Sequence, residues 1–562
     1  MTGGLDTSSK ARMTRRHLTA LVSGLIAASA LLLAGQQPAA DLILSNGKII
    51  TVDDRFTLAQ AVAVRGDRIV AVGTDQDVAR LAGPATRRID LDGEAVIPGL
   101  IDNHMHLMRA GTTWQREVRW DGVGSRKQAL DLLRARVSAT PPGEWIYTLG
   151  GWTLEQFADD KSPLTREELD RVVPWNPVLL QASYHKSYLN SRALQALGVD
   201  ETRPTDSWVV RDAAGRPTGV IEEAGIRTLA ARLPTATGEE LETSTRLMIR
   251  DMNKAGLTSF GSAGCETDVL PLYRRLSDQG RLNVRVFCIT GAAAGNAQQV
   301  ERVLLQVGGM KLLQGTNYID HVAYGESVYS PLHDPMFVKA SSPTPDELRE
   351  WRRIATEIAK AGLTLHVHAN LTDTIDAFLD QVELIDKEYP IRNLRWTLAH
   401  VNQINASHLA RMKSLGMLAA VHPWAVINGG INRSVFGDQA SDMPPLKTIQ
   451  DSGIVWGLGS DGSRANQILP FTTLWFAVTG KMVGGTTVLR QTIDRRDALI
   501  AHTRRNAQFV FREKEIGSIE PGKLADLVVL DRDYLTVPAD EIKNITPMLT
   551  IVGGRIVYDA TQ

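Results

Sequence analysis

Cysteine is nearly absent from this chain of 562 residues, which contains only Cys265 and Cys288. Both lie in apolar segments with the pattern of strands, so we interpret them as buried thiols that pack like small hydrophobic residues. A disulfide requires a close approach of the two Cα atoms, and nothing in the sequence indicates one. We therefore expect no disulfide.

An excess of charge is also lacking. The chain has 62 basic and 63 acidic residues, a formal net charge of -1, whereas a nucleic-acid-binding protein usually has a clustered basic excess. We therefore expect no nucleic-acid partner. A glycine-rich phosphate loop and a dinucleotide-binding motif beside the first barrel strand are missing too, which argues against a role that depends on ATP or NAD.

The N-terminal segment, residues 1–40, has the features of an export signal. Arg15 and Arg16 precede an apolar run, 18–34, and small residues suited to cleavage follow at 38–40. The paired arginines resemble a twin-arginine signal, which predicts export to the periplasm. The alternative is a membrane anchor, but the run is shorter than the roughly 20 apolar residues that cross a bilayer. We therefore expect no stable membrane span after cleavage.

The two ends of the mature chain have the same sequence pattern, because both consist of short alternating strands separated by turns. This pattern predicts a small β-sandwich domain made from residues 41–95 and 514–562. The mass of 61.5 kDa suits such a domain beside a larger barrel. A homodimer is compatible with this organisation.

The long middle part, 96–513, predicts an α/β fold, a (β/α)₈ TIM barrel. A gap from about 108 to 250 must be an insertion, rich in Trp and Pro, that we expect to cover the barrel mouth. Apolar strand candidates alternate with helical stretches and number eight: Val96–Ile101, Leu257–Ser262, Val284–Thr290, His321–Tyr324, Leu363–Val367, Leu394–Ala399, Met417–Val421 and Ile454–Gly459.

Histidines gather where these strands end. His104 and His106 end the first strand, and side chains at i and i+2 of a strand point the same way. His366 and His368 end the fifth strand and His400 ends the sixth; the eighth runs into Asp461. Barrel active sites lie at these carboxyl ends. The chain has only 12 histidines, so this clustering indicates a metal site.

The residue types fit that chemistry. Neutral imidazole and carboxylate suit Zn²⁺ or another divalent transition metal. Such a metal lowers the pKa of bound water and polarises a scissile carbonyl, and an adjacent carboxylate can move the proton to the leaving nitrogen. Asp461 is our candidate for this proton transfer.

The sequence resembles the metal-dependent amidohydrolase superfamily, in the branch that includes N-substituted formamide deformylase. The resemblance covers nearly the whole mature chain. It is strongest at Pro98–His106, at the later histidines and at Gly517–Val528. It implies a metal-dependent enzyme with one or two metals per chain. The metal ligands that it implies are His104, His106, His368, His400 and Asp461, with Asp461 also the general acid/base.

The sequence departs from many of these relatives at the fourth strand, where they carry a lysine that bridges two metals once it is carboxylated. Here the strand ends at Glu326, which we predict as a replacement ligand because a carboxylate binds metal without modification. Lys311 comes too early in the chain, before the turn that precedes the strand.

Other residues have two interpretations each. His366 is either a ligand or a packed histidine behind one. His185 lies in a loop that either reaches the site or is exposed, and His422 follows the seventh strand where it could line the pocket. Trp152, with Trp114 and Trp120, could build an apolar substrate wall or pack in a core.

Hydrolysis of a small-molecule amide, including N-acyl and N-formyl substrates, is the leading functional prediction. Deamination, or hydrolysis of an ester or carbamate, would use the same activated water. An exported binding protein without catalysis is a third interpretation, but it would predict loss of ligand positions, and all are intact. Fold resemblance does not determine the substrate.

Overall fold

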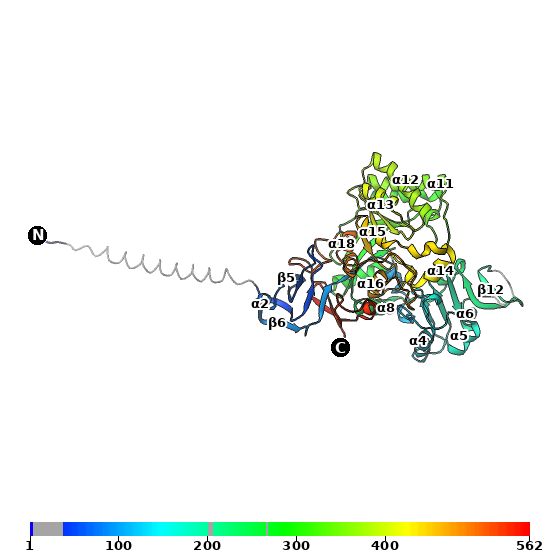
Figure 1. The fold of residues 1–562 in the computed structure, drawn as a ribbon, viewed down its shortest axis with the longest axis horizontal. Coiled ribbons are helices and arrows are strands. Elements are labelled where there is room, and N and C mark those ends of the chain that lie inside the picture. The colour runs from blue at the N-terminus through cyan, green and yellow to red at the C-terminus, as the bar shows by residue number, and fades with distance from the viewer. Residues whose placement is uncertain (4–37, 200–205, 266–267) are drawn as a thin grey trace.

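The computed structural model describes residues 1–3, 38–199, 206–265 and 268–562 (Figure 1). The predicted export signal, with Arg15, Arg16 and the apolar run, lies outside the described residues except for residues 1–3 and 38–40 at its two ends. Among the helices that are described, none is long and apolar enough to cross a membrane.

The central sheet has eight strands in the order β20-β19-β18-β17-β16-β15-β14-β8, and every neighbouring pair is parallel. Backbone hydrogen bonds from Asp461 N to His104 O and from His106 N to Gly462 O join the two end strands. The predicted TIM barrel is therefore confirmed. Its strands are β8 (Leu100–Met105), β14 (Leu257–Ala263), β15 (Arg285–Thr290), β16 (Ile319–Glu326), β17 (Leu365–Ala369), β18 (Thr397–His400), β19 (Leu418–Val421) and β20 (Trp456–Leu458).

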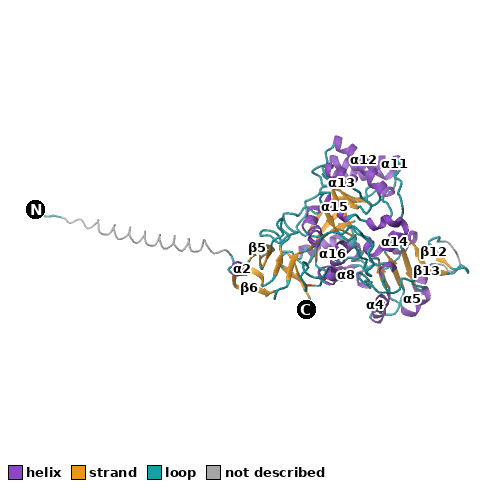
Figure 2. Cartoon of the chain, viewed as in Figure 1, coloured by secondary structure: helices purple, strands orange, loops and turns teal. Residues whose placement is uncertain are grey.

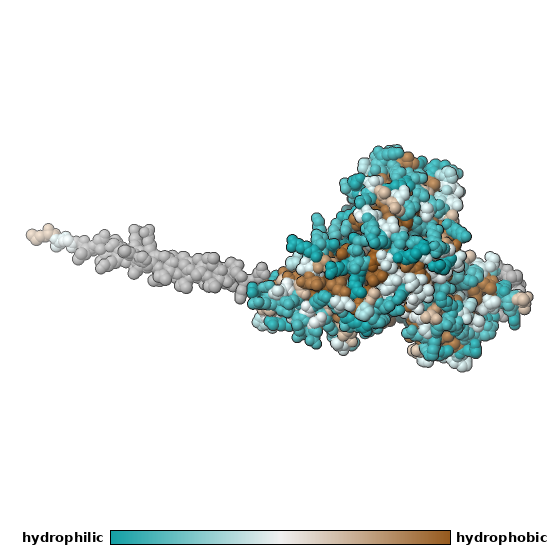
Figure 3. Space-filling view, viewed as in Figure 1, coloured by the Kyte–Doolittle hydropathy of each residue, from teal (hydrophilic) through white to brown (hydrophobic). Residues whose placement is uncertain are grey.

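Amphipathic helices cover the barrel, purple around the orange strands in Figure 2. In α11 (Pro345–Lys360), Thr344 and Glu347 form a capping box, and Trp351 and Ile354 face the core. Helices α8 (Gly238–Lys254), α12 (Thr372–Glu388) and α13 (Ala406–Leu415) also bury one face each. The outer faces of these helices remain polar, and the lobe of α11–α13 is mainly teal in Figure 3.

The first predicted strand, Val96–Ile101, is two strands in the structure. β7 (Ala95–Pro98) pairs with β2 (Lys48–Ile50) outside the barrel, whereas β8 starts at Leu100 inside it. Gly99 separates them, and a Cβ at this position would lie 2.2 Å from Thr258 Oγ1. A continuous apolar run does not reveal such a change of sheet, because both halves are buried.

Strands from residues 40–98 and 527–559 form two packed sheets, blue and red in Figure 1. One sheet has the order β5-β4-β1-β6 and the other β23-β22-β21-β7-β2-β3. Leu44, Val62, Val529 and Ile551 belong to the apolar cluster shared by the two sheets. The strands not yet introduced are β1 (Ala40–Ser45), β3 (Leu58–Ala59), β4 (Ala61–Arg65), β5 (Arg68–Gly73), β6 (Ala82–Asp90), β21 (Leu527–Leu530), β22 (Pro547–Val552) and β23 (Arg555–Asp559).

A buried ion pair ties this sandwich to the barrel. Arg285 at the start of β15 donates to Asp526 in a bidentate pair, with hydrogen bonds of 2.7 and 2.8 Å. Asp526 also accepts a hydrogen bond from the backbone N–H of Gly553, so both of its carboxylate oxygens have partners. The pair sits at the end of the barrel opposite the strand ends that carry the histidines, where it joins the two domains.

The insertion between β8 and β14 folds around a sheet of its own, with the order β12-β13-β11-β10-β9. Trp120, Trp152, Phe157 and Tyr188 pack together in its core with α4 (Arg126–Ser138). Helix α7 (Glu223–Ala230) leaves this unit toward the barrel. The strands are β9 (Ile146–Leu149), β10 (Val178–Ala182), β11 (Lys186–Leu189), β12 (Val209–Arg211) and β13 (Pro217–Glu222).

The expectation of two buried thiols was wrong. Cys265 and Cys288 form a disulfide, with a Cα–Cα distance of 5.5 Å. Strands β14 and β15 are neighbours, and Gly264 at φ +72° turns the chain after β14 so that Cys265 lies against Cys288. The register of two parallel strands and one left-handed turn decide this contact, and neither can be read from the sequence alone.

Candidate metal centre

The predicted ligands converge at the carboxyl ends of the barrel strands. His106, Glu326, His368, His400 and Asp461 line one cavity of about 540 Å³. Each of them ends or follows a barrel strand and points inward, as the alternation of side chains along a strand requires. Residues far apart in the sequence are therefore neighbours at this end of the barrel.

Two histidines of β8 face two carboxylates. His104 Nε2 lies 3.0 Å from Glu326 Oε2 and 3.6 Å from Asp461 Oδ1. His106 Nε2 lies 3.4 Å from Glu326 Oε1 and 3.3 Å from the same Asp461 oxygen. The HxH spacing thus places both Nε2 atoms beside the same oxygen, Asp461 Oδ1, as predicted from the strand period.

The later strands complete the cluster around Glu326. His400 Nε2 lies 3.5 Å and His368 Nδ1 4.0 Å from Glu326 Oε2. Oε1 of the same carboxylate faces His106. Glu326 therefore lies among four imidazoles, with His106 at Oε1 and His104, His368 and His400 at Oε2. Two sets of donor atoms, His104–His106–Asp461 and His104–Glu326–His400, each lie within 4.8 Å of one another.

Several of these atoms are buried without a hydrogen bond to any part of the chain that the structure describes. They are His104 Nε2, His400 Nε2 and Asp461 Oδ1. Burying polar atoms in this way is costly unless a partner satisfies them. A divalent cation at the point where they converge would do so, hence the residues present fit a metal.

The electrostatics of the cluster favour ionised carboxylates. Burial raises the pKa of Glu326, but His104 and His106 outweigh it and hold that pKa well below its usual range. Burial likewise raises the pKa of Asp461, and His400 with His106 lowers it below the ordinary value. Burial and the neighbouring His368 lower the pKa of His400 to about 4. Burial lowers the pKa of His104 and of His368, but Glu326 outweighs it at His104 and Asp334 at His368, so both pKa values lie above the ordinary value.

The Nδ1 atoms of His104 and His106 contact groups on the side of each ring that faces away from Glu326 and Asp461. His104 Nδ1 lies 2.9 Å from His366 Nε2, and His106 Nδ1 lies 3.0 Å from Ala263 O. His366 is thus a buried partner of His104 that faces away from the carboxylates. These contacts fix the orientation of both rings.

The same arrangement holds the rings on β17 and β18. His400 Nδ1 lies 2.9 Å from His422 Nδ1, and His422 Nε2 lies 2.8 Å from Asn103 Oδ1. His368 Nε2 lies 2.7 Å from Asp334 Oδ1. His422 therefore does not line the substrate cavity; it is fully buried behind His400.

Glu326 and Lys311 lie at opposite ends of β16. Glu326 ends the strand within the cluster, whereas Lys311 precedes the strand and lines a different cavity with Arg274 and His321. The structure therefore places Glu326, not Lys311, beside the histidines.

The other predicted substrate contacts lie away from the cavity. Trp152 is fully buried and packs edge-on against Trp120, with 4.5 Å between ring centroids, so the insertion uses it as core. His185 is half-buried and meets Phe337 edge-on. Its neighbour Tyr184 does line the cavity and accepts a hydrogen bond from Arg109.

Sequence reasoning missed several residues of the site. Trp424 lines the cavity and donates Nε1 to Asp461 Oδ2 at 2.8 Å. His333 stacks on His368, with 3.8 Å between ring centroids, and Asp334 follows it. Position after the seventh strand could have indicated Trp424, but the loop that carries Asp334 has no pattern that predicts contact with β17.

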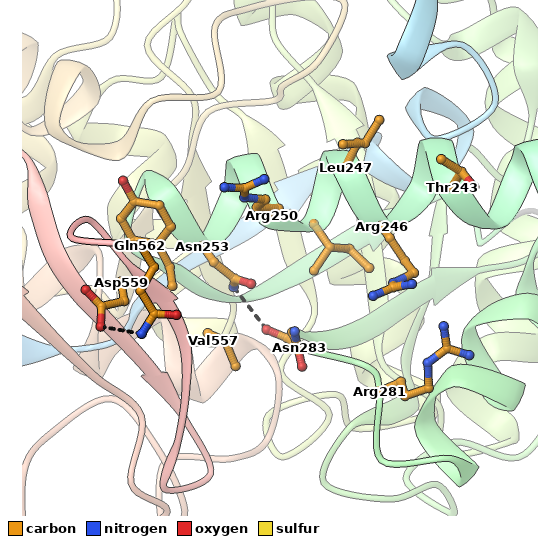
Figure 4. Close-up of a pocket in the computed structure, with 12 residues that line it drawn as sticks. Thr243, Arg246, Leu247, Arg250, Asn253, Arg281, Asn283, Val557, Asp559 and Gln562 are labelled. Carbon is orange, nitrogen blue, oxygen red and sulfur yellow. Dashed lines mark hydrogen bonds between the residues drawn. The ribbon is translucent and has the colours of Figure 1, made fainter.

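A second cavity, of about 410 Å³, lies between α8 and β23 (Figure 4). Arg246 and Arg250 project from α8, and Arg281 precedes β15. This cavity is at the amino ends of β14 and β15, and no histidine is among the residues that line it. The groups of described residues that could hold a metal ion, His104–His106–Asp461 and His104–Glu326–His400, lie at the carboxyl end of the barrel.

The model of the amidohydrolase family matches residues 87–558. The chain belongs to this family. It is a metal-dependent hydrolase that acts on C–N bonds.

Individual relatives cover almost the whole chain. N-substituted formamide deformylase from Arthrobacter pascens is 28% identical over 549 residues, which cover 93% of this chain and 99% of that protein. An uncharacterized metal-dependent hydrolase from Pyrococcus horikoshii OT3 has a TM-score of 0.63 at 20% identity, covering 89% of this chain and 99% of that one. An adenosine deaminase from Xanthomonas campestris with bound Zn has a TM-score of 0.51 at 15% identity, covering 93% of each chain.

Proposed function

We propose that the chain hydrolyses a small-molecule amide, including N-acyl and N-formyl compounds, with zinc held at the cluster. The observation that carries this proposal is the convergence of four imidazoles and two ionised carboxylates on one buried point. Imidazole nitrogen with carboxylate oxygen is a donor set that Zn²⁺ and related divalent ions prefer. The proposed ligands are His104, His106, Glu326, His368, His400 and Asp461.

Two ions per chain fit the donor atoms better than one. Glu326 directs Oε1 toward His106 and Oε2 toward His104, His368 and His400. One ion beside each carboxylate oxygen would engage all four imidazoles. We therefore propose that Glu326 bridges two ions without the modification that a lysine would need.

A bound divalent ion lowers the pKa of water to ~7 and polarises a scissile carbonyl. Asp461 is ionised and buried at this point, so it can take a proton from the attacking water. Trp424 holds Oδ2, which leaves Oδ1 on the side of His104 and His106. The same carboxyl group then delivers the proton to the leaving nitrogen.

The amide class rests on the family and on the similarity to N-substituted formamide deformylase from Arthrobacter pascens. A cavity of about 540 Å³ suits a small molecule. Apolar side chains on its wall, including Ile226 of α7 and Met336, suit an apolar substituent on the nitrogen or acyl group.

Export to the periplasm through a twin-arginine signal also belongs to this proposal. The Cys265–Cys288 disulfide supports it, because disulfides persist in oxidising compartments and are rare in the cytosol. Export of a folded protein would allow the metals to be taken up beforehand. Amino-terminal sequencing of the secreted protein tests the cleavage near residue 40, and light scattering tests the predicted homodimer.

The test of the catalytic proposal combines metal analysis with a substrate panel. We expect about two equivalents of zinc per chain, and turnover of N-formyl or N-acyl amides in preference to esters, carbamates and amino-substituted rings. Asp461→Asn is the inactive control. Turnover confined to the amino-substituted rings would make the protein a deaminase. A chain that neither contains zinc nor takes it up would contradict a catalytic function.

A further inference from the structure

We propose that Asp334 is a positioning residue that makes His368 present Nδ1, rather than Nε2, to the metal centre. The inference rests on the proposed metal site. It adds a residue outside the ligand set that controls how tightly one of the two ions is held.

The geometry at His368 leaves the ring one orientation. Nε2 lies 2.7 Å from Asp334 Oδ1 and 2.9 Å from the backbone oxygen of the same residue. Both partners are acceptors, so Nε2 must carry the proton. In the neutral ring that a metal ligand requires, Nδ1 is then the unprotonated nitrogen, and it faces Glu326 Oε2, 4.0 Å away.

His368 differs in this respect from the other three histidines. His104, His106 and His400 all direct Nε2 toward the carboxylates. Their rear nitrogens meet two histidine rings and the carbonyl of Ala263, each 2.9 to 3.0 Å away. His368 is turned the other way, and its rear nitrogen lies at hydrogen-bond distance from a carboxylate, 2.7 Å from Asp334, whereas the nearest carboxylate oxygen to His400 Nδ1 is 3.7 Å away. A carboxylate behind an imidazole increases the basicity of the nitrogen that binds metal.

Asp334 is itself held in place. Its side chain is buried, and Oδ2 accepts hydrogen bonds from Leu371 N at 2.8 Å and Asn370 N at 3.0 Å. The loop after β16 is thereby fastened to the turn after β17. His333 stacks on the outer face of the His368 ring. The ring is therefore fixed by a hydrogen bond at its edge and by stacking on its face before any ion arrives.

The direct test is the zinc affinity of Asp334→Asn, measured on the full mature chain by competition with a chelator. Loss of a second-layer carboxylate typically weakens metal binding by about 10- to 100-fold. We expect that loss for one of the two ions, together with a changed visible absorption spectrum of the Co²⁺-loaded protein. The spectrum reports ligand geometry, which a merely structural role of Asp334 would not alter.

Asp320→Asn is the matched control. Asp320 is also a buried aspartate of the same strand region, but it pairs with Arg512 at 2.6 Å, at the opposite end of β16. This variant should lose stability and keep the parent's zinc affinity and Co²⁺ spectrum.

The zinc affinity and the Co²⁺ spectrum together test the proposed role of Asp334. Asp334→Asn with the parent's affinity and spectrum would overturn the role of Asp334. If that variant does not fold, Asp334→Glu takes its place: the retained charge should keep affinity within about threefold. A folded Asp334→Glu protein that loses the ion would also overturn it. A parent protein that binds no zinc would instead overturn the proposed function, so the two failures are distinguishable.

Discussion

Trp424 donates its indole N–H to Asp461 Oδ2 across 2.8 Å, and this contact aims the other carboxylate oxygen at the metal centre. Oδ1 is buried, has no hydrogen bond within the described chain, and lies 3.3 Å from His106 Nε2. A carboxylate with one oxygen fixed and the other directed at the reaction site can accept a proton without first reorienting. Trp424 and Asp461 therefore act as a pair.

The first prediction concerns the carboxylate. Asp461→Asn keeps the size and the hydrogen-bond acceptor for Trp424, so the fold and most of the metal should remain. The amide cannot take a proton, and general acid–base catalysis typically contributes ~10²- to 10⁴-fold to the rate. We expect kcat to fall by at least that factor in a steady-state assay with the best substrate of the panel. Activity near that of the parent would show that another group moves the proton.

The second prediction concerns the indole. Trp424→Phe keeps an aromatic ring against His400 but removes the donor to Asp461. A hydrogen bond to a charged group is worth about 1.5–3 kcal/mol, so kcat should fall roughly ten- to a hundredfold with unchanged zinc content.

Trp351→Phe is its control. Trp351 is equally buried, but its indole nitrogen has no hydrogen bond in the described part of the chain, and its ring stacks on Phe378 in the outer helices. Its replacement should leave kcat unaltered. Equal losses in both variants would mean that the Trp424 effect comes from packing alone.

The third prediction concerns the proposed bridge. Glu326→Ala removes the carboxylate that lies within 4.0 Å of four imidazoles, so the zinc content should fall from about two ions per chain to one or none. Plasma emission analysis of the dialysed protein measures this directly. Lys311→Ala, at the far end of β16, is the control and should keep both ions. The reverse pattern would return the bridging role to Lys311.

The ligand cluster could be predicted because it depends on local rules. His104 and His106 share a face by the two-residue period of a strand, and every barrel strand delivers its last residues to the same end. His368, His400 and Asp461 end or follow predicted strands by the same rule. Glu326 became a candidate through the family resemblance, as the residue in place of a bridging lysine, and the resemblance also implied the set of ligands.

Residues that the sequence did not reveal depend on packing between distant segments. Trp152 was a candidate for the pocket because tryptophan suits both a substrate wall and a core, and the core of the insertion was the outcome. Asp334 contacts His368 through a loop whose path no periodic pattern specifies. The Cys265–Cys288 contact depends on the register of β14 against β15 and on the turn at Gly264.

The fourth prediction concerns that disulfide. It closes a loop with a sequence separation of 23 residues, for which the chain-entropy estimate is about 3 kcal/mol of stability. Ala263, which binds His106 Nδ1 through its carbonyl, is two residues before Cys265. Cys265→Ser/Cys288→Ser should therefore lower the thermal midpoint and also weaken zinc binding. Calorimetry and chelator competition on the two proteins measure both effects, and an unchanged midpoint would show that the disulfide is dispensable.

The fifth prediction concerns the pH dependence of stability through His502, which is buried near the barrel and away from the proposed ligands. Burial lowers its pKa to about 4, against an ordinary value of 6.5. Between these two values the unfolded chain binds a proton at this site and the folded chain does not, so protonation favours unfolding as the pH falls from about 6.5 to 4. Above pH 6.5 both states are neutral and the effect vanishes. His502→Gln removes the linkage.

The measurement for His502 is urea unfolding of the metal-free parent and His502→Gln proteins at several pH values. Taking the metal away separates this linkage from protonation of the ligands. The free energy of unfolding of the parent should decline relative to that of the variant by on the order of 3 kcal/mol between pH 7 and 4, since each pKa unit corresponds to about 1.36 kcal/mol. Two parallel curves would mean that His502 can take up a proton in the folded state, through water or a local opening of the barrel base.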